Sequence, residues 1–169
     1  SIAILDLKVN PRPQAAVTVT GNATFCAGDS VQLSAALQTG VNYQWFRNGV
    51  PMAGANQHLF MARSSGTYYL VAENAFGCTD TSQQITLDRI QLPVAVISTP
   101  TTQICTGDSI RLSGPTVATG VNYVWRRNQQ VIAGANAQHL WITQPGDYQL
   151  ELSSTQGCAT LSAVITIMP

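Results

Sequence analysis

One short stretch occurs twice in this chain and strongly constrains its fold. Residues 40–45 read Gly-Val-Asn-Tyr-Gln-Trp, and residues 120–125 read Gly-Val-Asn-Tyr-Val-Trp. In the first copy, apolar side chains at every second position alternate with polar ones, which is the period of a strand with one buried face. A Trp at the centre of such a strand needs a deep core to pack in. We therefore expect Trp45 and Trp125 to lie in two separate cores.

The sequence around this stretch repeats as well, and the repeat decides the domain division. We expect a first domain over residues 14–90 and a second over residues 91–169. Residues 1–13 are interpreted as the last strand of a preceding repeat or a linker, and an extra edge strand of the first repeat is the alternative. The matching segments are 26–30 with 105–109, 53–56 with 133–136, 66–68 with 146–148, and 77–78 with 157–158.

Short runs with strand periodicity, separated by turn signals, account for the first repeat, and no segment has a helical period. Asn48-Gly49 marks a hairpin turn between two of these runs. The sequence therefore predicts an all-β chain made of two sandwich domains. The expected strands are residues 16–20, 31–35, 41–47, 50–52, 58–62 and 67–73, with a last strand that ends near Leu87.

Composition excludes several classes of partner. Only 9% of the residues are charged, the net charge is zero, and no run of Lys or Arg is present. Nucleic acids and acidic membrane surfaces are therefore not expected as partners, because both attract basic surfaces. No apolar run is long enough to predict insertion into a membrane.

The sequence offers no catalytic constellation and no cofactor site. The four cysteines are too far apart for zinc-ligand pairs. Asp29 and Asp108 lie singly in Gly-Asp-Ser turns and do not form a calcium site. His58 and His139 are interpreted as equivalent, structural or solvent-facing positions. We expect no enzyme activity, because the acidic residues also lie too sparsely to form the carboxylate pair of a glycosidase.

The Trp strand, with Gly66-Thr67-Tyr68 and Gly146-Asp147-Tyr148, resembles the immunoglobulin fold, in which a Tyr of this kind forms a tyrosine corner. This resemblance implies core positions for Trp45, Trp125, Tyr68 and Tyr148. The sequence departs from the family at Ala35 and Leu70, near which the family's core cysteines would fall.

The pattern Phe/Ile-Cys-x-Gly-Asp-Ser-Val/Ile-x-Leu, followed by Tyr-x-Trp, Gly-x-Tyr and Gly-Cys, resembles a narrower group. It is similar to the tandem immunoglobulin-like repeats of secreted and surface proteins of the Bacteroidetes. That resemblance implies an extracellular or cell-surface location and a non-catalytic role as a stalk, spacer or adhesive segment. The implied partners are neighbouring repeats and an unidentified protein or carbohydrate ligand at the cell surface.

The same resemblance implies disulfides within each repeat, Cys26 with Cys78 and Cys105 with Cys158, each worth roughly 4 kcal/mol by chain entropy. Geometry raises an alternative. In an immunoglobulin topology the turns that carry the two cysteines lie at opposite ends of the sandwich. A six-residue strand spans roughly 20 Å, whereas bridged Cα atoms lie within about 7 Å of each other. Cys26 would then face Cys158, leaving Cys78 and Cys105 for other modules.

The expected strand over residues 58–62 and its counterpart in the second repeat are apolar on both faces, so their inward-facing side chains are not predictable. Phe60 and Trp141 are the candidate ligand contacts, and either of them facing outward would offer a stacking surface for a sugar or an apolar partner. A core position or an interdomain contact is the alternative. The second functional hypothesis is therefore a carbohydrate-binding module attached to a secreted glycoside hydrolase.

Overall fold

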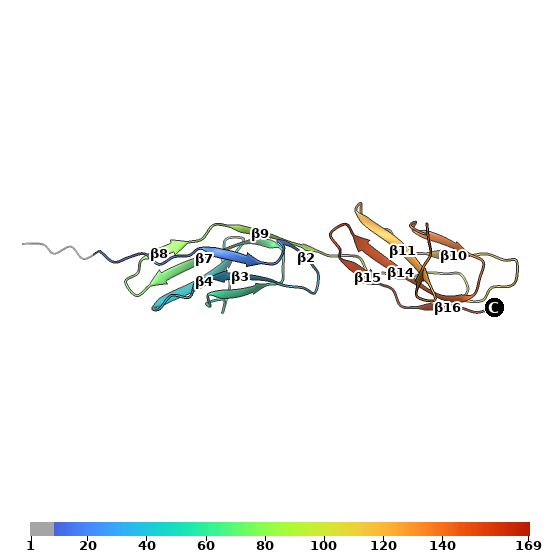
Figure 1. Cartoon of the computed structure of the whole chain (residues 1–169), viewed down its shortest axis with the longest axis horizontal. Coiled ribbons are helices and arrows are strands. Elements are labelled where there is room, and N and C mark those ends of the chain that lie inside the picture. Colours follow the sequence, from blue (N-terminus) through green and yellow to red (C-terminus); the bar gives the residue numbers. More distant parts are fainter. Residues whose placement is uncertain (1–8) are drawn as a thin grey trace, which may run out of the picture. The chain divides into compact units, whose positions relative to one another are not determined.

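The computed structural model describes residues 9–169, and its contacts divide the chain into two units (Figure 1). The first unit ends at Arg89 and the second begins at Ile90. Every regular element in the described residues is a strand. The all-β prediction is thereby confirmed. The strand expected near the start of the chain falls on residues 1–8, which lie outside the described part.

The first unit is a sandwich of two sheets. One sheet has the strand order β1-β3-β6, and the other has the order β2-β9-β7-β4-β5. The short strand β8 also pairs with β7, along residues 71–73. This arrangement, with a split first strand shared between the sheets, is that of an immunoglobulin-like sandwich. The strands are β1 (Val17–Thr20), β2 (Thr24–Cys26), β3 (Val31–Ala35), β4 (Val41–Arg47), β5 (Val50–Pro51), β6 (Leu59–Ala62), β7 (Gly66–Asn74), β8 (Thr79–Thr81) and β9 (Ile85–Ile90).

The second unit has the same two-sheet plan, but its opening segment forms isolated bridges instead of strands. Its smaller sheet pairs β10 with β13, and its larger sheet has the order β12-β11-β14-β15, with β16 also paired to β14. In place of two opening strands, the chain contributes isolated bridges at Ser98–Ser113 and Gln103–Met168. The strands are β10 (Ile110–Ser113), β11 (Val121–Arg127), β12 (Gln130–Val131), β13 (His139–Ile142), β14 (Gly146–Ser154), β15 (Ala159–Leu161) and β16 (Ile165–Ile167).

Each unit encloses its own apolar core around a Trp. Alternate residues of β3, β4 and β7 point between the two sheets, as the strand period requires. Trp45 is fully buried, and its indole N–H donates to the carbonyl of Gln57 at 2.8 Å. Trp125 is equally buried and donates to the carbonyl of Ala137 at 2.9 Å. The expected tryptophan cores therefore form without leaving a buried donor unpaired.

A buried Tyr closes each sandwich near its edge. The Tyr68 hydroxyl donates to the carbonyl of Ser64 at 2.8 Å, and the Tyr148 hydroxyl donates to the carbonyl of Gln144 at 2.8 Å. Both bonds reach back four residues, which is the geometry of the tyrosine corner. Burial raises the pKa of both hydroxyls above the ordinary value of Tyr, and a nearby Arg partly offsets this.

The last strand of each sandwich is broken, which the sequence did not predict. In the first unit, β8 and β9 are separated at Ser82, whose hydroxyl accepts the N–H of Leu70 at 2.9 Å. In the second unit, Ser162 accepts the N–H of Leu150 at 3.0 Å. Each Ser is buried. Its hydroxyl therefore replaces a backbone partner that the break removes from the sheet.

Candidate functional site

Trp141 lies on β13, which pairs with β10 in the smaller sheet of the second unit. Its side chain is 66% exposed, the highest value for an aromatic side chain of the described residues. Its neighbours on the strand, Leu140 and Ile142, pack toward the second core. Alternation along β13 therefore forces Trp141 outward.

A shallow pocket of about 210 Å³ lies next to Trp141. Arg127, Gln144 and Tyr148 supply its polar wall. The Arg127 guanidinium already donates to the carbonyl of Pro145 at 2.8 Å and also contacts the Gln144 side chain. Ligand pockets usually measure about 300 Å³ or more. This pocket is smaller than the sites that enclose drug-sized ligands, and Trp141 beside it offers a flat stacking surface.

Phe60 does not share the surroundings of Trp141, although the two residues are paired candidates on sequence. Phe60 lies against the first core, with its ring centroid 5.7 Å from Trp45 and 5.9 Å from Tyr68. The residue of β6 that matches Trp141 is Met61, since both precede the buried last residue of their strand. Met61 is exposed on the surface. Phe60 is thus a core residue.

The two histidines are not equivalent, contrary to the expectation from sequence. His139 belongs to β13, where its Cα is paired with that of Ser113. The corresponding residue of the first unit is Leu59, paired with Ser34. His58 lies one residue before β6, and its ring centroid is 6.4 Å from that of Tyr43. A one-residue offset between the two His-containing segments explains the error.

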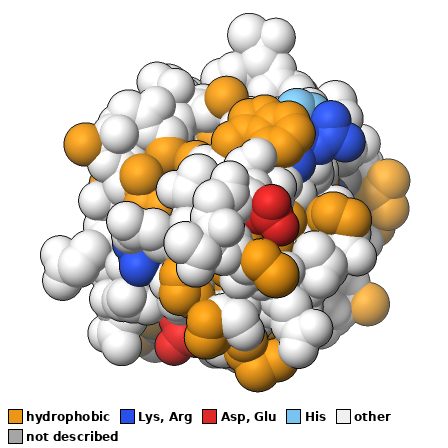
Figure 2. Space-filling model, turned by 90° about the vertical axis from the view of Figure 1, so that its right-hand side faces the viewer, with side chains coloured by type: hydrophobic (Ala, Val, Ile, Leu, Met, Phe, Trp, Pro, Cys, Tyr) orange, Lys and Arg blue, Asp and Glu red, His pale blue; other side chains and the backbone are white. Residues whose placement is uncertain are grey.

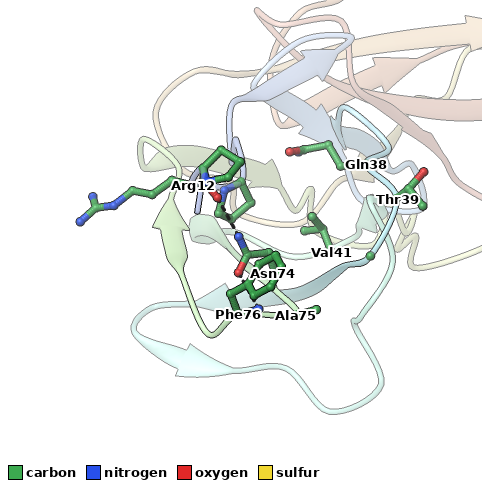
Figure 3. A pocket seen from close by; sticks show the side chains of 10 residues that line it. Arg12, Gln38, Thr39, Val41, Asn74, Ala75 and Phe76 are labelled. Atoms are coloured by element: carbon green, nitrogen blue, oxygen red, sulfur yellow. Dashed lines mark hydrogen bonds between the residues drawn. The ribbon is translucent and has the colours of Figure 1, made fainter. Parts of the chain in front are cut away.

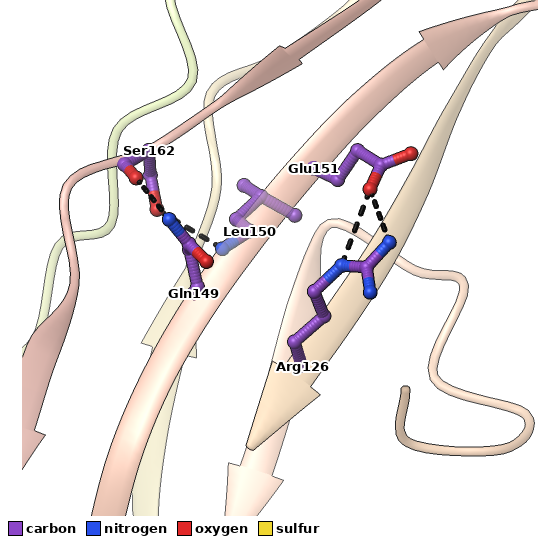
Figure 4. Close-up of polar contacts among 5 residues, drawn as sticks. All are labelled: Arg126, Gln149, Leu150, Glu151 and Ser162. Atoms are coloured by element: carbon purple, nitrogen blue, oxygen red, sulfur yellow. Dashed lines mark hydrogen bonds and ion pairs between the residues drawn. The ribbon is translucent and has the colours of Figure 1, made fainter. Parts of the chain in front are cut away.

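The outer faces of the two larger sheets carry different chemistry. In the first unit, Phe46 stacks on Tyr69 with ring centroids 4.8 Å apart. In the second unit, Arg126 occupies the position of Phe46 and pairs with Glu151 at 2.5 Å (Figure 4). Both members of the pair are partly exposed, so water weakens their attraction. Neither arrangement by itself forms a catalytic group.

A second shallow pocket, of about 290 Å³, lies at one end of the first unit (Figure 3). Asn74 organises this end, because its side-chain amide donates to the carbonyl of Pro11 at 2.8 Å. Its side-chain oxygen accepts the N–H groups of Phe76 and Cys78, both at 3.0 Å. Sequence reasoning did not single out Asn74, although its place before the Gly77-Cys78 turn is a detectable signal. Hydrogen bonds of Asn74 fix the chain around this pocket, and Phe76 in its wall is exposed.

The cysteines are in two different states. Cys26 and Cys158 are disulfide-bonded, whereas Cys78 and Cys105 carry free thiols. The predicted pairs within each repeat are therefore wrong, because each of them needs one of the free thiols. The physical reason is that each pair would join turns at opposite ends of one sandwich.

The described residues contain no cluster of metal-ligating side chains. Within the described residues, no group of three or more His, Cys, Asp or Glu side chains could hold a metal ion. Asp29 and Asp108 lie in matching turns, where each backbone N–H donates to a Cys carbonyl. Figure 2 shows a face on which hydrophobic side chains are scattered, with only a few charged groups among them. In residues 9–169 there is no helix with the length and hydrophobicity to cross a membrane.

Comparison with protein families identifies the first repeat. Residues 13–88 match the model of the family described as "Ig-like domain CHU_C associated". An immunoglobulin-like domain of this family occupies the first repeat. The prediction of immunoglobulin-like sandwiches is confirmed. No curated protein matches the sequence significantly.

Several solved structures are similar to this chain at low sequence identity. Murine CEACAM1b has a TM-score of 0.45 and 15% identity, over 89% of this chain and 98% of that chain. A mouse coronavirus receptor-binding domain complexed with its murine receptor gives a TM-score of 0.48 and 16% identity over the same shares. The N-terminal four Ig domains of Dscam1 isoform 9.44 give 0.42 and 17%, over 94% of this chain and 46% of that chain.

Proposed function

We propose that this chain is a non-catalytic extracellular spacer, in which immunoglobulin-like repeats follow one another within a larger surface or secreted protein. The observation that carries this proposal is the position of the chain ends in each repeat. The chain comes in at one end of the sandwich and leaves at the other. Each repeat therefore adds the length of its sandwich to the path of the chain.

The two ends of the first unit are defined by hydrogen bonds. At the end that we call the head, the incoming Pro11 carbonyl accepts the amide of Asn74, the last residue of β7. At the opposite end, the tail, Gly66 of β7 pairs with Leu87 of the outgoing strand β9. Nine residues of β7 join head to tail, and at about 3.3 Å per residue this is roughly 26 Å.

Within the second unit the chain also enters at the head and leaves at the tail. Its tail is the end where Gly146 of β14 pairs with Ile167 of the outgoing strand. Close to this end, the N–H of Ile104 donates to the carbonyl of Met168 at 2.9 Å. Its head is the end where β14 finishes at Ser154. Two repeats that each carry the chain from head to tail support a spacer that can be lengthened by adding repeats.

An extracellular location is supported by the cysteines. Disulfide bonds persist in oxidising compartments and are rare in reducing ones. Cys26 and Cys158 are disulfide-bonded. The resemblance to secreted and surface repeats of the Bacteroidetes, and the family match of the first repeat, favour the same location.

The second candidate function is carbohydrate recognition by the second repeat, and the exposure of Trp141 favours it. An exposed indole face can stack on the apolar face of a sugar ring. The Cα of Arg111, also exposed, is paired with that of Trp141 across β10 and β13. A single aromatic beside a shallow pocket gives little contact area, so we rank this function second.

One screen distinguishes the two functions. The chain is tested on a glycan array and for depletion by insoluble polysaccharides, together with Trp141→Ala and Met61→Ala. Met61 is the control, because it is also exposed and lies at the matching position of the first repeat. A spacer predicts no retention of the folded chain. Retention that is lost in Trp141→Ala and kept in Met61→Ala would replace the spacer proposal with sugar recognition.

A further inference from the structure

We propose that the second unit pairs with the second unit of another copy of this chain through the open edge of β13. The two β13 strands run antiparallel and join the two smaller sheets into one continuous sheet. This inference goes beyond the spacer proposal, because it assigns a lateral contact between spacers to one strand. It also explains the exposure of Trp141 without a sugar ligand.

The backbone direction of β13 follows from its pairing with β10. Just before β13, the N–H of Gly114 donates to the carbonyl of Gln138 at 2.8 Å. Opposed residues of an antiparallel pair alternate between bonded and non-bonded positions. Leu140 is therefore bonded to β10, whereas His139 and Trp141 direct their N–H and carbonyl groups away from it.

The same alternation holds on β10. Ser113 is paired with His139, and its N–H and carbonyl both bond to Ser98, at 2.9 Å, on the side away from β13. On the outer side of β13, residues 9–169 provide no further strand and no hydrogen-bond partner for the backbone of His139 or Trp141. Unpaired backbone groups along an edge are a template for another strand.

The edge of β13 lacks the charged residues that usually prevent strand pairing. Residues 136–144 read Asn-Ala-Gln-His-Leu-Trp-Ile-Thr-Gln and contain no Asp, Glu, Lys or Arg. The matching edge strand of the first unit, β6, is followed by exposed Arg63, where the second unit has Thr143. The edge of β13 is therefore the less protected of the two.

A second copy fits this edge because the edge is complementary to itself. With a two-fold axis between the two Leu140 residues, His139 of each copy lies opposite Trp141 of the other. Each opposed pair exchanges N–H···O bonds in both directions, which gives about four new hydrogen bonds. His139 and Trp141 are both exposed on the same face of β13. The pairing therefore places an indole beside an imidazole at both ends of the contact, and cross-strand pairs of this kind stabilise sheets.

The cations near the edge do not oppose this contact. The Cα of Arg111 is paired with that of Trp141 across β10 and β13. In the joined sheet the two Arg111 residues lie on the two β10 strands, about 14 Å apart. The Debye length at physiological salt is about 8 Å, so their repulsion is largely screened. Arg127, in the wall of the pocket beside Trp141, donates to the carbonyl of Pro145.

The size of the exposed surface predicts the strength of the association. Trp141 is 66% exposed, and a Trp side chain buries about 150–250 Å² when it is covered. Two such side chains and two short strands bury less than the roughly 1,200 Å² of a stable interface. We therefore expect a reversible dimer at high protein concentration. Spacers anchored side by side would meet at a high effective concentration.

The test is sedimentation equilibrium of the full chain over a wide range of protein concentration, with the free thiols blocked by alkylation. We expect the average mass to rise from that of a monomer toward that of a dimer. Trp141→Lys should stay monomeric, because lysine adds a charge to the edge. Met61→Lys is the matched control, since Met61 is exposed at the same position of β6, and it should associate like the unsubstituted chain.

Amide hydrogen exchange of the unsubstituted chain examines the strand edge itself. The N–H groups of His139 and Trp141 should exchange several-fold more slowly in the concentrated sample than in the dilute one. The N–H of Leu140, which already faces β10, is the internal control and should exchange equally fast in both samples. This comparison needs no substitution, so it holds even where a variant is unstable.

Several results would overturn the proposal. A chain that stays monomeric at every concentration does not pair through β13. Association that Trp141→Lys leaves unchanged would place the contact on another surface, and association without slower exchange at His139 and Trp141 would exclude backbone pairing. A monomeric chain that a polysaccharide retains through Trp141 would assign this strand to sugar recognition. The spacer proposal does not require a dimer, so failure to associate leaves it unchanged.

Discussion

The pairing of Cys26 with Cys158, the alternative raised by the strand geometry, has a mechanical consequence that can be measured. If the chain is pulled by its two ends, a bond between these two residues transmits the force directly. The residues between them then bear no load. Only the residues before Cys26 and after Cys158 can then be extended. Reducing the bond, or removing it in Cys158→Ser, returns the rest of the chain to the path of the force.

The expected change is large. About 35 residues lie outside the bond, and at about 3.4 Å per residue they contribute roughly 120 Å of extended chain. With the bond removed, the full chain of 169 residues contributes roughly 570 Å. The ratio of nearly five does not depend on how strongly either sandwich resists unfolding.

Force spectroscopy on single molecules, with handles fused beyond both ends of the chain, measures this length directly. Oxidised protein is compared with the same protein in a reducing agent and with Cys158→Ser. Cys78→Ser is the matched control, because it removes a thiol that is already free. It should leave the extended length of the oxidised protein unchanged.

Two lengths would contradict the reasoning. An oxidised molecule that extends as far as the reduced one carries no bond between Cys26 and Cys158. An extension of roughly 210 Å would indicate bonds within each repeat, because such bonds leave about 60 residues outside their loops.

Three further predictions concern the stability of the second unit. Gln129 has a positive φ of 68° in the β11–β12 turn, where the first unit has Gly49 at 80°; Gln129→Gly should therefore stabilise the protein by about 1 kcal/mol in urea unfolding, and the reciprocal Gly49→Gln should destabilise it. Ser162→Ala leaves the buried N–H of Leu150 without its partner, and should lower the free energy of unfolding by about 1–3 kcal/mol, whereas substitution of an exposed Ser should not. Burial raises the pKa of the Tyr148 hydroxyl, so the folded state holds this proton more tightly than the unfolded state. The free energy of unfolding should therefore fall as the pH rises above about 10. A free energy that does not change with pH in this range, or one that falls equally steeply in Tyr148→Phe, would contradict that assignment.

The sequence was sufficient for most strands because their period is regular. The Trp stretch predicted β4 with the same bounds that the structure gives it, and β11 occupies the matching residues of the second repeat. Two features had no such signal. The strand β2 contains only three residues, too few to show a period. The break between β8 and β9 depends on a buried hydroxyl of Ser82, and an isolated Ser is more often a surface residue.

The candidate contacts could not be predicted because β6 and β13 carry apolar residues on both faces. Their direction follows from the register, in which Leu33 is paired with Phe60 and Arg111 with Trp141. A one-residue shift reverses which side chain points outward. That dependence explains why Phe60 and Trp141 are alike in sequence and different in the structure.

Comparison of the two repeats separates what the architecture needs from what it leaves free. The Trp cores, the tyrosine corners and both Cys turns are the same in the two units. The outer faces of the larger sheets are not, since a Phe46–Tyr69 stack in one becomes an Arg126–Glu151 pair in the other. A spacer requires a stable core in each repeat but makes no demand on these faces. A ligand-binding function would instead reside in a face, and it would then belong to one repeat, as the exposure of Trp141 indicates.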